Sequence, residues 1–200
     1  MEDKFIRAVD STGSVGVKVI YAKEMVENAR KCHDLTPTAC ACLGRTLIMT
    51  SMIGETLKGD DEKTTVMIKG DGPIGGIVCC SDNSMKTKGY VHNPEVDIPL
   101  KPNGKLDVSG AIGAGNLTII KDLGLKEPYS GMINLVSGEI AEDFTYYYTK
   151  SEQQPSAIGL GVLVDTDCSI AEAGGFWISI LPFAKDEVID QIEKNLSKIT

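Results

Sequence analysis

The stretch PTACACLGRTLIMTSMIGETL, residues 37–57, decides the fold of this 200-residue chain. Thr36 is a favourable N-cap residue, and Pro37 suits the first helical position because the N–H that it lacks would have no helical partner there. Gly59 ends the helical pattern. The sequence therefore predicts one helix that begins at Thr36 or Pro37 and ends at residue 57 or 58.

This predicted helix is apolar on every side. Between Ala39 and Leu57 the only charged residues are Arg45 and Glu55, while Ala, Cys, Leu, Ile and Met occupy all faces. A helix that is apolar all round must be buried. It is short and rich in Thr, Ser and Gly for a membrane span, so other elements must cover more than one of its sides. Two β-sheets would provide that cover.

Alternating residues on both sides of the helix predict β-strands. Val15, Val17, Val19 and Tyr21 alternate with other residues after a Ser-Thr-Gly turn, which indicates an opening hairpin formed by residues 5–8 and 15–22. Further strands are expected at 64–69, 74–81, 86–92, 116–121, 131–136, 156–164 and 175–182.

Three more helices are expected. Residues 23–31 predict a helix that lies on a surface, and residues 140–153 predict one that interrupts the late strands. Residues 185–196 predict a final amphipathic helix with Val188, Ile189, Ile192 and Leu196 on one face.

Residues 94–115, which are rich in Pro and Gly, are expected to form a long connection. Within it, Val96, Ile98 and Leu100 are candidates for a short edge strand.

Composition narrows the classes of partner. The net charge is −8 and the pI is about 4.8, and the 20 Lys and Arg residues are scattered rather than gathered into a stripe. A phosphate backbone would be repelled, so no nucleic-acid partner is expected. The first residues lack the basic and apolar pattern of a signal peptide, and no apolar run approaches the length of a membrane span. We therefore expect a cytoplasmic protein without a membrane partner.

The motif GDGPIG, residues 70–75, fits the G-x-G-x-x-G pattern of dinucleotide sites. That chemistry requires a helix N-terminus directly after the glycines. Here Pro73 lies inside the motif, and Ile77 and Val78 continue as a strand. The motif is therefore interpreted as a turn.

The six cysteines favour reduced, mostly buried thiols. Cys40 and Cys42 lie two residues apart on a helix and point about 200° apart, so they cannot hold one ion unaided. Cys79 and Cys80 are neighbours in a strand and face opposite sides of the sheet. The remaining two cysteines are Cys32 and Cys168.

Other candidate groups have simpler structural explanations. Cys32 and His33 diverge from each other, which is typical of a solvated helix end rather than a nucleophile–base pair. Three acidic residues at the start of a helix complement its macrodipole; they are Glu139, Glu142 and Asp143. The aromatic run Tyr146-Tyr147-Tyr148 is expected to lie mostly in the core.

Two long segments carry a family resemblance. YSGMINLVSGEIAEDF, residues 129–144, and YYYTKSEQQPSAIGLGVLV, residues 146–164, closely resemble the 33-kilodalton heat-shock protein family of redox-regulated holdase chaperones. The resemblance covers essentially all 200 residues in family order. It includes LGR at 43–45, GDGP at 70–73, KDLG at 121–124, AGG at 173–175 and LP at 181–182.

The resemblance implies an α+β fold in which helices are sandwiched between two β-sheets in a three-layer β-α-β arrangement. It implies a single core domain, residues 1–182, followed by residues 183–200 as a C-terminal helix that leads to a linker. It also implies an ATP-independent holdase that binds unfolding client proteins in a stress response, is typically a homodimer, and is switched on when zinc-bound thiolates become disulfides.

The family's zinc ligands form a C-x-C and a C-x-x-C pair, expected in a switch domain beyond Thr200. Cys40 and Cys42 therefore receive no ligand role, and zinc is expected only in that further domain. No catalytic, cofactor-binding or metal-binding residue is assigned to the chain, which is not expected to be an enzyme. Without the switch, the 200 residues are expected to hold clients independently of peroxide, or to associate.

Two alternatives remain open. A small cytosolic enzyme could use Cys32, Cys79 or Cys168 as a nucleophile, and it would require a thiol with a lowered pKa. A purely structural oligomerisation domain would not suppress client aggregation at any ratio.

Overall fold

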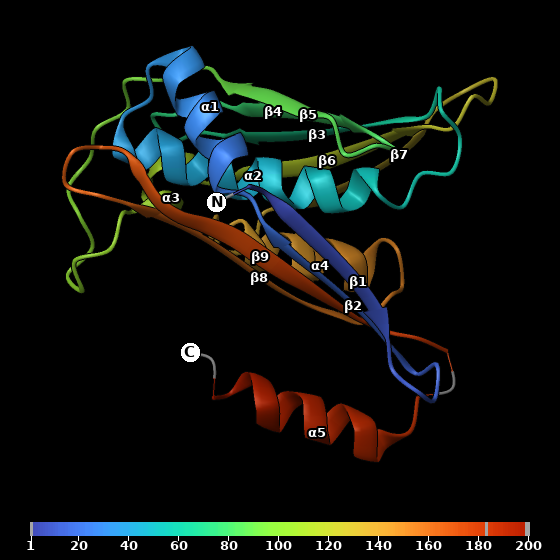
Figure 1. The fold of residues 1–200 in the computed structure, drawn as a ribbon. Coiled ribbons are helices and arrows are strands. Elements are labelled where there is room, and N and C mark those ends of the chain that lie inside the picture. Colours follow the sequence, from blue (N-terminus) through green and yellow to red (C-terminus); the bar gives the residue numbers. More distant parts are fainter. Residues whose placement is uncertain (1, 183, 199–200) are drawn as a thin grey trace.

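Two antiparallel sheets enclose the central helix in the computed structural model, which describes residues 2–182 and 184–198 (Figure 1). The elements in chain order are β1 Lys4–Val9, β2 Val15–Tyr21, α1 Lys23–His33, α2 Pro37–Gly54, β3 Lys63–Gly70, β4 Ile77–Asp82, β5 Thr87–Val91, α3 Val108–Ile112, β6 Gly115–Asp122, β7 Tyr129–Asn134, α4 Ala141–Lys150, β8 Ser156–Val164, β9 Ile170–Ile180 and α5 Asp186–Leu196. The predicted three-layer α+β sandwich is confirmed.

The helix α2 is buried along its whole length. Leu47 is 1% exposed, and of the residues from Thr38 to Gly54 only Arg45 is not fully buried. Two glycines show how closely the sheets approach. A Cβ on Gly44 would lie 2.8 Å from a methyl group of Val162 in β8, and a Cβ on Gly54 would lie 2.4 Å from the hydroxyl of Ser81 in β4. Sheets therefore cover α2 from both sides, as its apolar circumference requires.

The start of α2 differs from the prediction in one detail. Pro37 opens the helix and Thr36 occupies the N-cap position, but the Thr36 side chain does not cap it. The hydroxyl instead donates to the carbonyl oxygens of Pro94 and Val96, at 3.2 and 2.6 Å. Thr36 thus binds the long connection to the start of α2 and does not cap the helix.

Sheet A contains four strands in the order β1-β2-β9-β8, and sheet B contains five in the order β5-β4-β3-β6-β7. The predicted opening hairpin is confirmed, with Lys4 opposite Tyr21 and Val9 opposite Gly16. Sheet A joins this N-terminal hairpin to the last two strands of the chain. The helix α1 lies beside α2 at one end of the sandwich, and Val26 is its only buried residue, as expected for a surface helix.

Several boundaries were predicted wrongly. The segment 96–100 forms no strand; Val96 is buried, whereas Leu100 is 58% exposed. The same connection contains the short helix α3, which the sequence analysis missed. The last strand begins at Ile170 rather than residue 175. The glycine motif at 70–75 is a turn between β3 and β4, as predicted. Phe183, where the second predicted segment begins, lies outside the described residues.

Candidate functional site

The side chains of sheet A alternate between an inner and an outer face. Ile20 and Trp177 are 6% and 4% exposed and point inward, onto the helical layer. Their strand neighbours Val19 and Phe176 lie opposite each other and point outward. The outward residues include a set that we name the outer apolar face: Ile6, Ala8, Val17, Val19, Ala157, Leu163, Phe176 and Ile178.

The outer apolar face reaches solvent at three large side chains. Ile6 is 63% exposed, Leu163 61% and Val19 43%. The Phe176 ring lies over Gly159 on β8, where a Cβ would come within 2.4 Å of Phe176 Cε1. A sheet surface with exposed aliphatic side chains can pack against any apolar partner.

Charges on this face are confined to one end of the sheet. Of the outward-pointing strand residues only Lys4 and Glu172 are charged, and Glu172 lies beside Tyr21. Burial, followed by the hydrogen bond with Glu172, raises the pKa of the Tyr21 phenol above its usual value. The middle of the face therefore has no charge that would oppose apolar contact.

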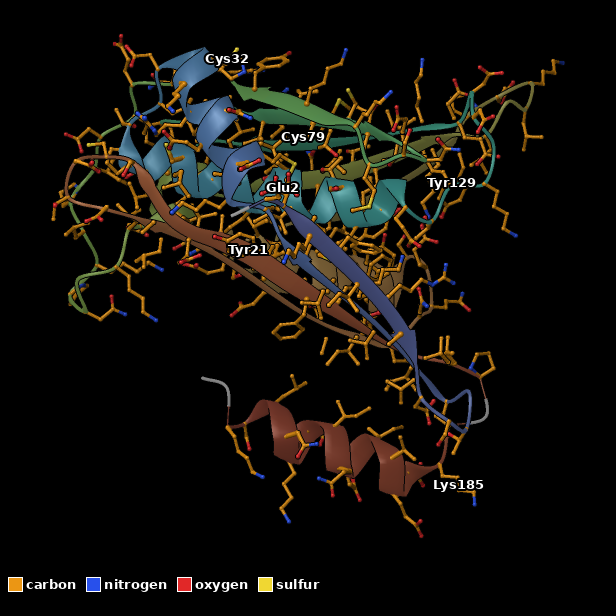
Figure 2. The ribbon with its side chains drawn as sticks, viewed as in Figure 1. Glu2, Tyr21, Cys32, Cys79, Tyr129 and Lys185 are labelled. Atoms are coloured by element: carbon orange, nitrogen blue, oxygen red, sulfur yellow. The ribbon has the colours of Figure 1, made fainter. Side chains whose placement is uncertain are left out.

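The helix α5 lies on the outer side of sheet A (Figure 1). Its apolar residues Val188, Ile189, Ile192 and Leu196 are half-buried, and none of its residues is fully buried. Figure 2 shows Lys185 where α5 begins, at the end of the sandwich opposite α1. The predicted amphipathic helix is confirmed.

The strands that carry the outer apolar face were predicted from the sequence, but the face was not. The alternation in residues 15–21 distinguishes two faces but does not tell which one points outward. The packing of sheet A against α2 decides that, because it buries Ile20 and Trp177 on the side of the helical layer. The only available signal was that both faces of β2 carry aliphatic residues, which is unusual for a sheet with one solvated face.

The six cysteines are free and lie in different environments. Cys40, Cys42 and Cys79 are buried, and burial raises the pKa of the first two thiols to about 12 and that of Cys79 still further. Cys80 is half-buried, which confirms that it faces away from Cys79. Cys32 and Cys168 are exposed, so the expectation of mostly buried thiols is wrong for these two.

Cys32 and His33 line one cavity at the end of α1, but the imidazole is engaged elsewhere. His33 Nε2 lies 2.9 Å from the carbonyl oxygen of Gly89 in β5 and donates to it, because a carbonyl oxygen can only accept. Figure 2 shows Cys32 on the outer part of α1, at a distance from Cys79 on β4. The hydrogen bond from His33 to Gly89 therefore joins α1 to β5, the edge strand of sheet B.

The acidic cluster at α4 has more specific roles than the macrodipole explanation gave it. Asp143 is fully buried and accepts hydrogen bonds from the backbone N–H groups of Val136, Ser137 and Ile140. Glu139 instead precedes the helix and bonds to Arg45 and Lys101. Burial acts to raise the pKa of Glu139, but these cations outweigh it and hold that pKa below its usual value.

Glu142, the third acidic residue of this cluster, is exposed. The Tyr run lies mostly in the core, as predicted: Tyr147 is fully buried, Tyr148 packs on Trp177 with ring centroids 4.4 Å apart, and Tyr146 is 38% exposed.

The described residues contain no group of three or more His, Cys, Asp or Glu side chains placed to hold a metal ion. None of the helices in this part of the chain has both the length and the apolar character needed to cross a bilayer.

Comparison with known proteins agrees with this architecture. The family model described as Hsp33 protein matches residues 3–200. The 33 kDa chaperonin of Enterococcus faecalis is 51% identical over 200 residues, which cover 100% of this chain and 67% of that protein. The 33 kDa chaperonin of Acetivibrio thermocellus is 50% identical over 199 residues, again covering 100% of this chain and 67% of the relative.

A solved structure is similar as well. The crystal structure of the 33 kDa chaperonin (heat shock protein 33 homolog) of Thermotoga maritima has a TM-score of 0.92 at 42% sequence identity, covering 96% of this chain and 66% of that one. The chain thus spans about two thirds of the length of these relatives. The family model and these identities together show that the chain belongs to the Hsp33 family.

Proposed function

We propose that the protein is an ATP-independent holdase chaperone that binds unfolding polypeptides and prevents their aggregation. The observation that supports this most directly is the outer apolar face, where Ile6 and Leu163 are both more than 60% exposed on one sheet. Unfolding proteins expose apolar segments of many sequences, and an apolar surface that binds without directional contacts discriminates little among them. That client binding requires no ATP is also part of the proposal.

We propose that the helix α5, which lies on the outer side of sheet A, regulates access to this face by moving toward it or away from it. Its apolar residues Val188, Ile189, Ile192 and Leu196 are half-buried and would supply the apolar side of such a contact. None of its side chains is fully buried, so displacing it would cost less than unfolding a core element. We propose residues 1–182 as the client-presenting core and residues 183–200 as a segment that leads to a regulatory linker.

Regulation by zinc and by oxidation belongs to the same proposal. The described residues hold no metal cluster, so a zinc–thiolate switch would lie in the third of the relatives' length that this chain does not match. We further propose a cytoplasmic homodimer that performs no catalysis and binds neither nucleic acid nor membranes. The net charge of −8 supports the last two points.

A pair of charge substitutions tests the proposed surface. Ile6→Lys combined with Leu163→Lys places two cations on the outer apolar face, while Leu125→Lys places one in the loop between β6 and β7, where Leu125 is 69% exposed. Light scattering of a heat-aggregating client measures the holdase activity. Burial of an Ile or Leu is worth about 1.5–3 kcal/mol, so the double variant should require about tenfold more protein for equal suppression.

The Leu125→Lys variant should match the unsubstituted chain in this assay. Equal activity of all three proteins would reject the outer apolar face as the client surface. Failure of the unsubstituted chain to suppress scattering at any ratio, with or without peroxide, would reject holdase activity and favour a structural oligomerisation domain.

A further inference from the structure

The strand β1 lies at the margin of sheet A and pairs only with β2 among the described strands (Figure 1). A strand at a sheet edge presents a row of backbone N–H and C=O groups without partners, and this row can accept another extended chain. The other edge strand of the sheet, β8, has an irregular register only at its end, between Leu163 and Val164. No such irregularity interrupts the pairing of β1.

The direction of the backbone groups of β1 follows from one hydrogen bond. The N–H of Asp10 donates to the carbonyl oxygen of Val15 at 3.0 Å, so Asp10 faces β2. Because facing alternates along an antiparallel strand, Ile6 and Ala8 also direct their backbone groups toward β2. Phe5, Arg7 and Val9 direct theirs away from the sheet, and within the described residues no backbone hydrogen bond to them is found on that side.

The side chains near this edge leave it accessible. The guanidinium group of Arg7 lies 3.1 Å from a carboxylate oxygen of Glu55, so it is held by an acceptor from the end of α2. The edge strand of sheet B is protected differently. There, His33 of α1 binds the outward carbonyl oxygen of Gly89 in β5. The two sheets therefore differ, with one edge covered by a helix and the other open.

A cavity of about 590 Å³ lies beside the start of β1. Phe5 lines it together with other apolar side chains, among them Ile20, Met25 and Leu47, and with charged ones, among them Asp3, Glu24 and Lys88. Phe5 lies opposite the buried Ile20, so its side chain is on the inner face of sheet A. A strand added beside β1 would place alternate side chains on that same face, above the cavity. Its remaining side chains would lie next to Ile6, on the outer apolar face.

We propose that an unfolding client binds by adding an extended segment to β1 as a fifth strand of sheet A. The client segment bonds to the backbone of Phe5, Arg7 and Val9, which accounts for binding that does not depend on sequence. Its side chains on one face are apolar, since they extend the outer apolar face, and those on the other face meet the mixed apolar and charged lining of the cavity. This inference rests on the proposed holdase function and specifies the bound form of the client.

Amide hydrogen exchange tests the inference residue by residue. The probe is a reduced and alkylated, permanently unfolded protein added to the full chain. Exchange at the amides of Phe5, Arg7 and Val9 should slow at least about tenfold, because strand addition gives them hydrogen-bond partners. Ile6 and Ala8, which already bond to β2, should change less. Unchanged exchange at the three outward amides, under conditions where scattering is suppressed, would overturn strand addition and leave the holdase proposal intact.

A proline variant provides an independent measurement. Arg7→Pro removes the outward N–H without removing a bond to β2, and proline is tolerated at sheet edges. Arg7→Ala is the matched variant, because it loses the same contact with Glu55 and keeps the N–H. Arg7→Pro should bind the unfolded probe several-fold more weakly than Arg7→Ala, with circular dichroism confirming that both are folded. Equal binding would contradict the inference.

The concentration dependence of the exchange distinguishes the client from a second copy of the chain. Protection of the three amides that appears without the probe and increases with the concentration of the chain would assign the edge to self-association and overturn client addition. Absence of scattering suppression by the unsubstituted chain would remove the holdase proposal, and this inference with it.

Discussion

The ammonium group of Lys18 lies 2.8 Å from carboxylate oxygen Oε2 of Glu55, and the two side chains are only 14% and 16% exposed. The same ammonium lies 4.5 Å from the centroid of the Trp177 ring. Burial lowers the pKa of Lys18, and Glu55 partly offsets that effect. This contact joins β2 of sheet A to the residue that follows α2, so it connects two of the three layers.

Removal of the Glu55 charge should destabilise the protein. Glu55→Gln leaves the Lys18 ammonium largely buried without a counter-ion, and the expected loss is about 1–3 kcal/mol in the free energy of unfolding. Urea denaturation measures it. Arg7→Ala removes the exposed cation on the same carboxylate and should cost no more than about 0.5 kcal/mol. Equal losses for the two variants would contradict a structural role for the buried pair.

Glu27 should make stability depend on acidic pH. Its carboxylate binds Arg30 at 2.7 Å and accepts the N–H of Ile170 at 3.1 Å, which joins α1 to β9. The hydrogen bond from Arg30, followed by that from Ile170, outweighs burial and lowers the pKa of Glu27 from 4.5 to about 2. The ionised form is therefore favoured in the folded protein, and this stabilisation is present above pH 4.5 and is lost as the pH falls toward 2.

The corresponding variant is Glu27→Gln. It should be less stable by about 1–2 kcal/mol at pH 7, with solvent screening already taken into account, and the gap from the unsubstituted chain should narrow below pH 4.5. Denaturant titrations at several pH values measure this. Glu24→Gln alters an exposed residue of the same helix and should show no such narrowing. A constant gap at all pH values would refute the role of ionised Glu27.

Gly131 should tolerate no larger side chain. A Cβ at this position of β7 would lie 2.3 Å from the Tyr147 hydroxyl, and Tyr147 is fully buried. Gly131→Ala therefore forces β7 and α4 apart and should cost about 1–3 kcal/mol. Gly161→Ala in β8 adds a methyl group where nothing lies within 4 Å, so its thermal midpoint should stay close to that of the unsubstituted chain. A harmless Gly131→Ala would show that this contact can relax.

Thiol alkylation should separate the cysteines into two groups. Cys32 and Cys168 are exposed and should react in the native protein, whereas Cys40, Cys42 and Cys79 should react only on unfolding. Mass spectrometry after timed alkylation measures the order. Burial and the raised thiol pKa values of the second group both oppose reaction. Reaction of Cys32 or Cys168 far faster than that of a free thiol at neutral pH would favour the cysteine-enzyme alternative.

The parts of the fold set by local patterns could be predicted from the sequence. The strand β8 coincides with the predicted 156–164, and α2 begins at Pro37 as expected, because alternation and an apolar helix circumference are properties of adjacent residues. The helix α3 was missed because its five residues span little more than one turn and include Gly110. The supposed strand at 96–100 was wrong because Val96 is held by Thr36 rather than by a neighbouring strand.

The candidate site depends on long-range contacts and so could not be predicted. Which side of β2 faces outward is decided by the packing of sheet A against α2, and no local pattern contains that information. The early part of β9 was likewise missed because Glu172 and Gly174 weaken the strand pattern there, although pairing with β8 keeps it extended. Pairing with β8 therefore determines the structure of this segment, although its local sequence has a low strand propensity.

The strand order of sheet A also constrains how the chain is made. The hairpin of β1 and β2 is synthesised first, but its neighbour β9 ends at Ile180, so sheet A cannot close until the chain as far as Ile180 has left the ribosome. Sheet B is complete by Asn134, so during translation α2 is covered on one flank and bare on the other. During translation there is therefore an interval in which an apolar side of α2 is exposed and can aggregate. Protection of such exposed apolar segments is what the folded protein is proposed to provide for its clients.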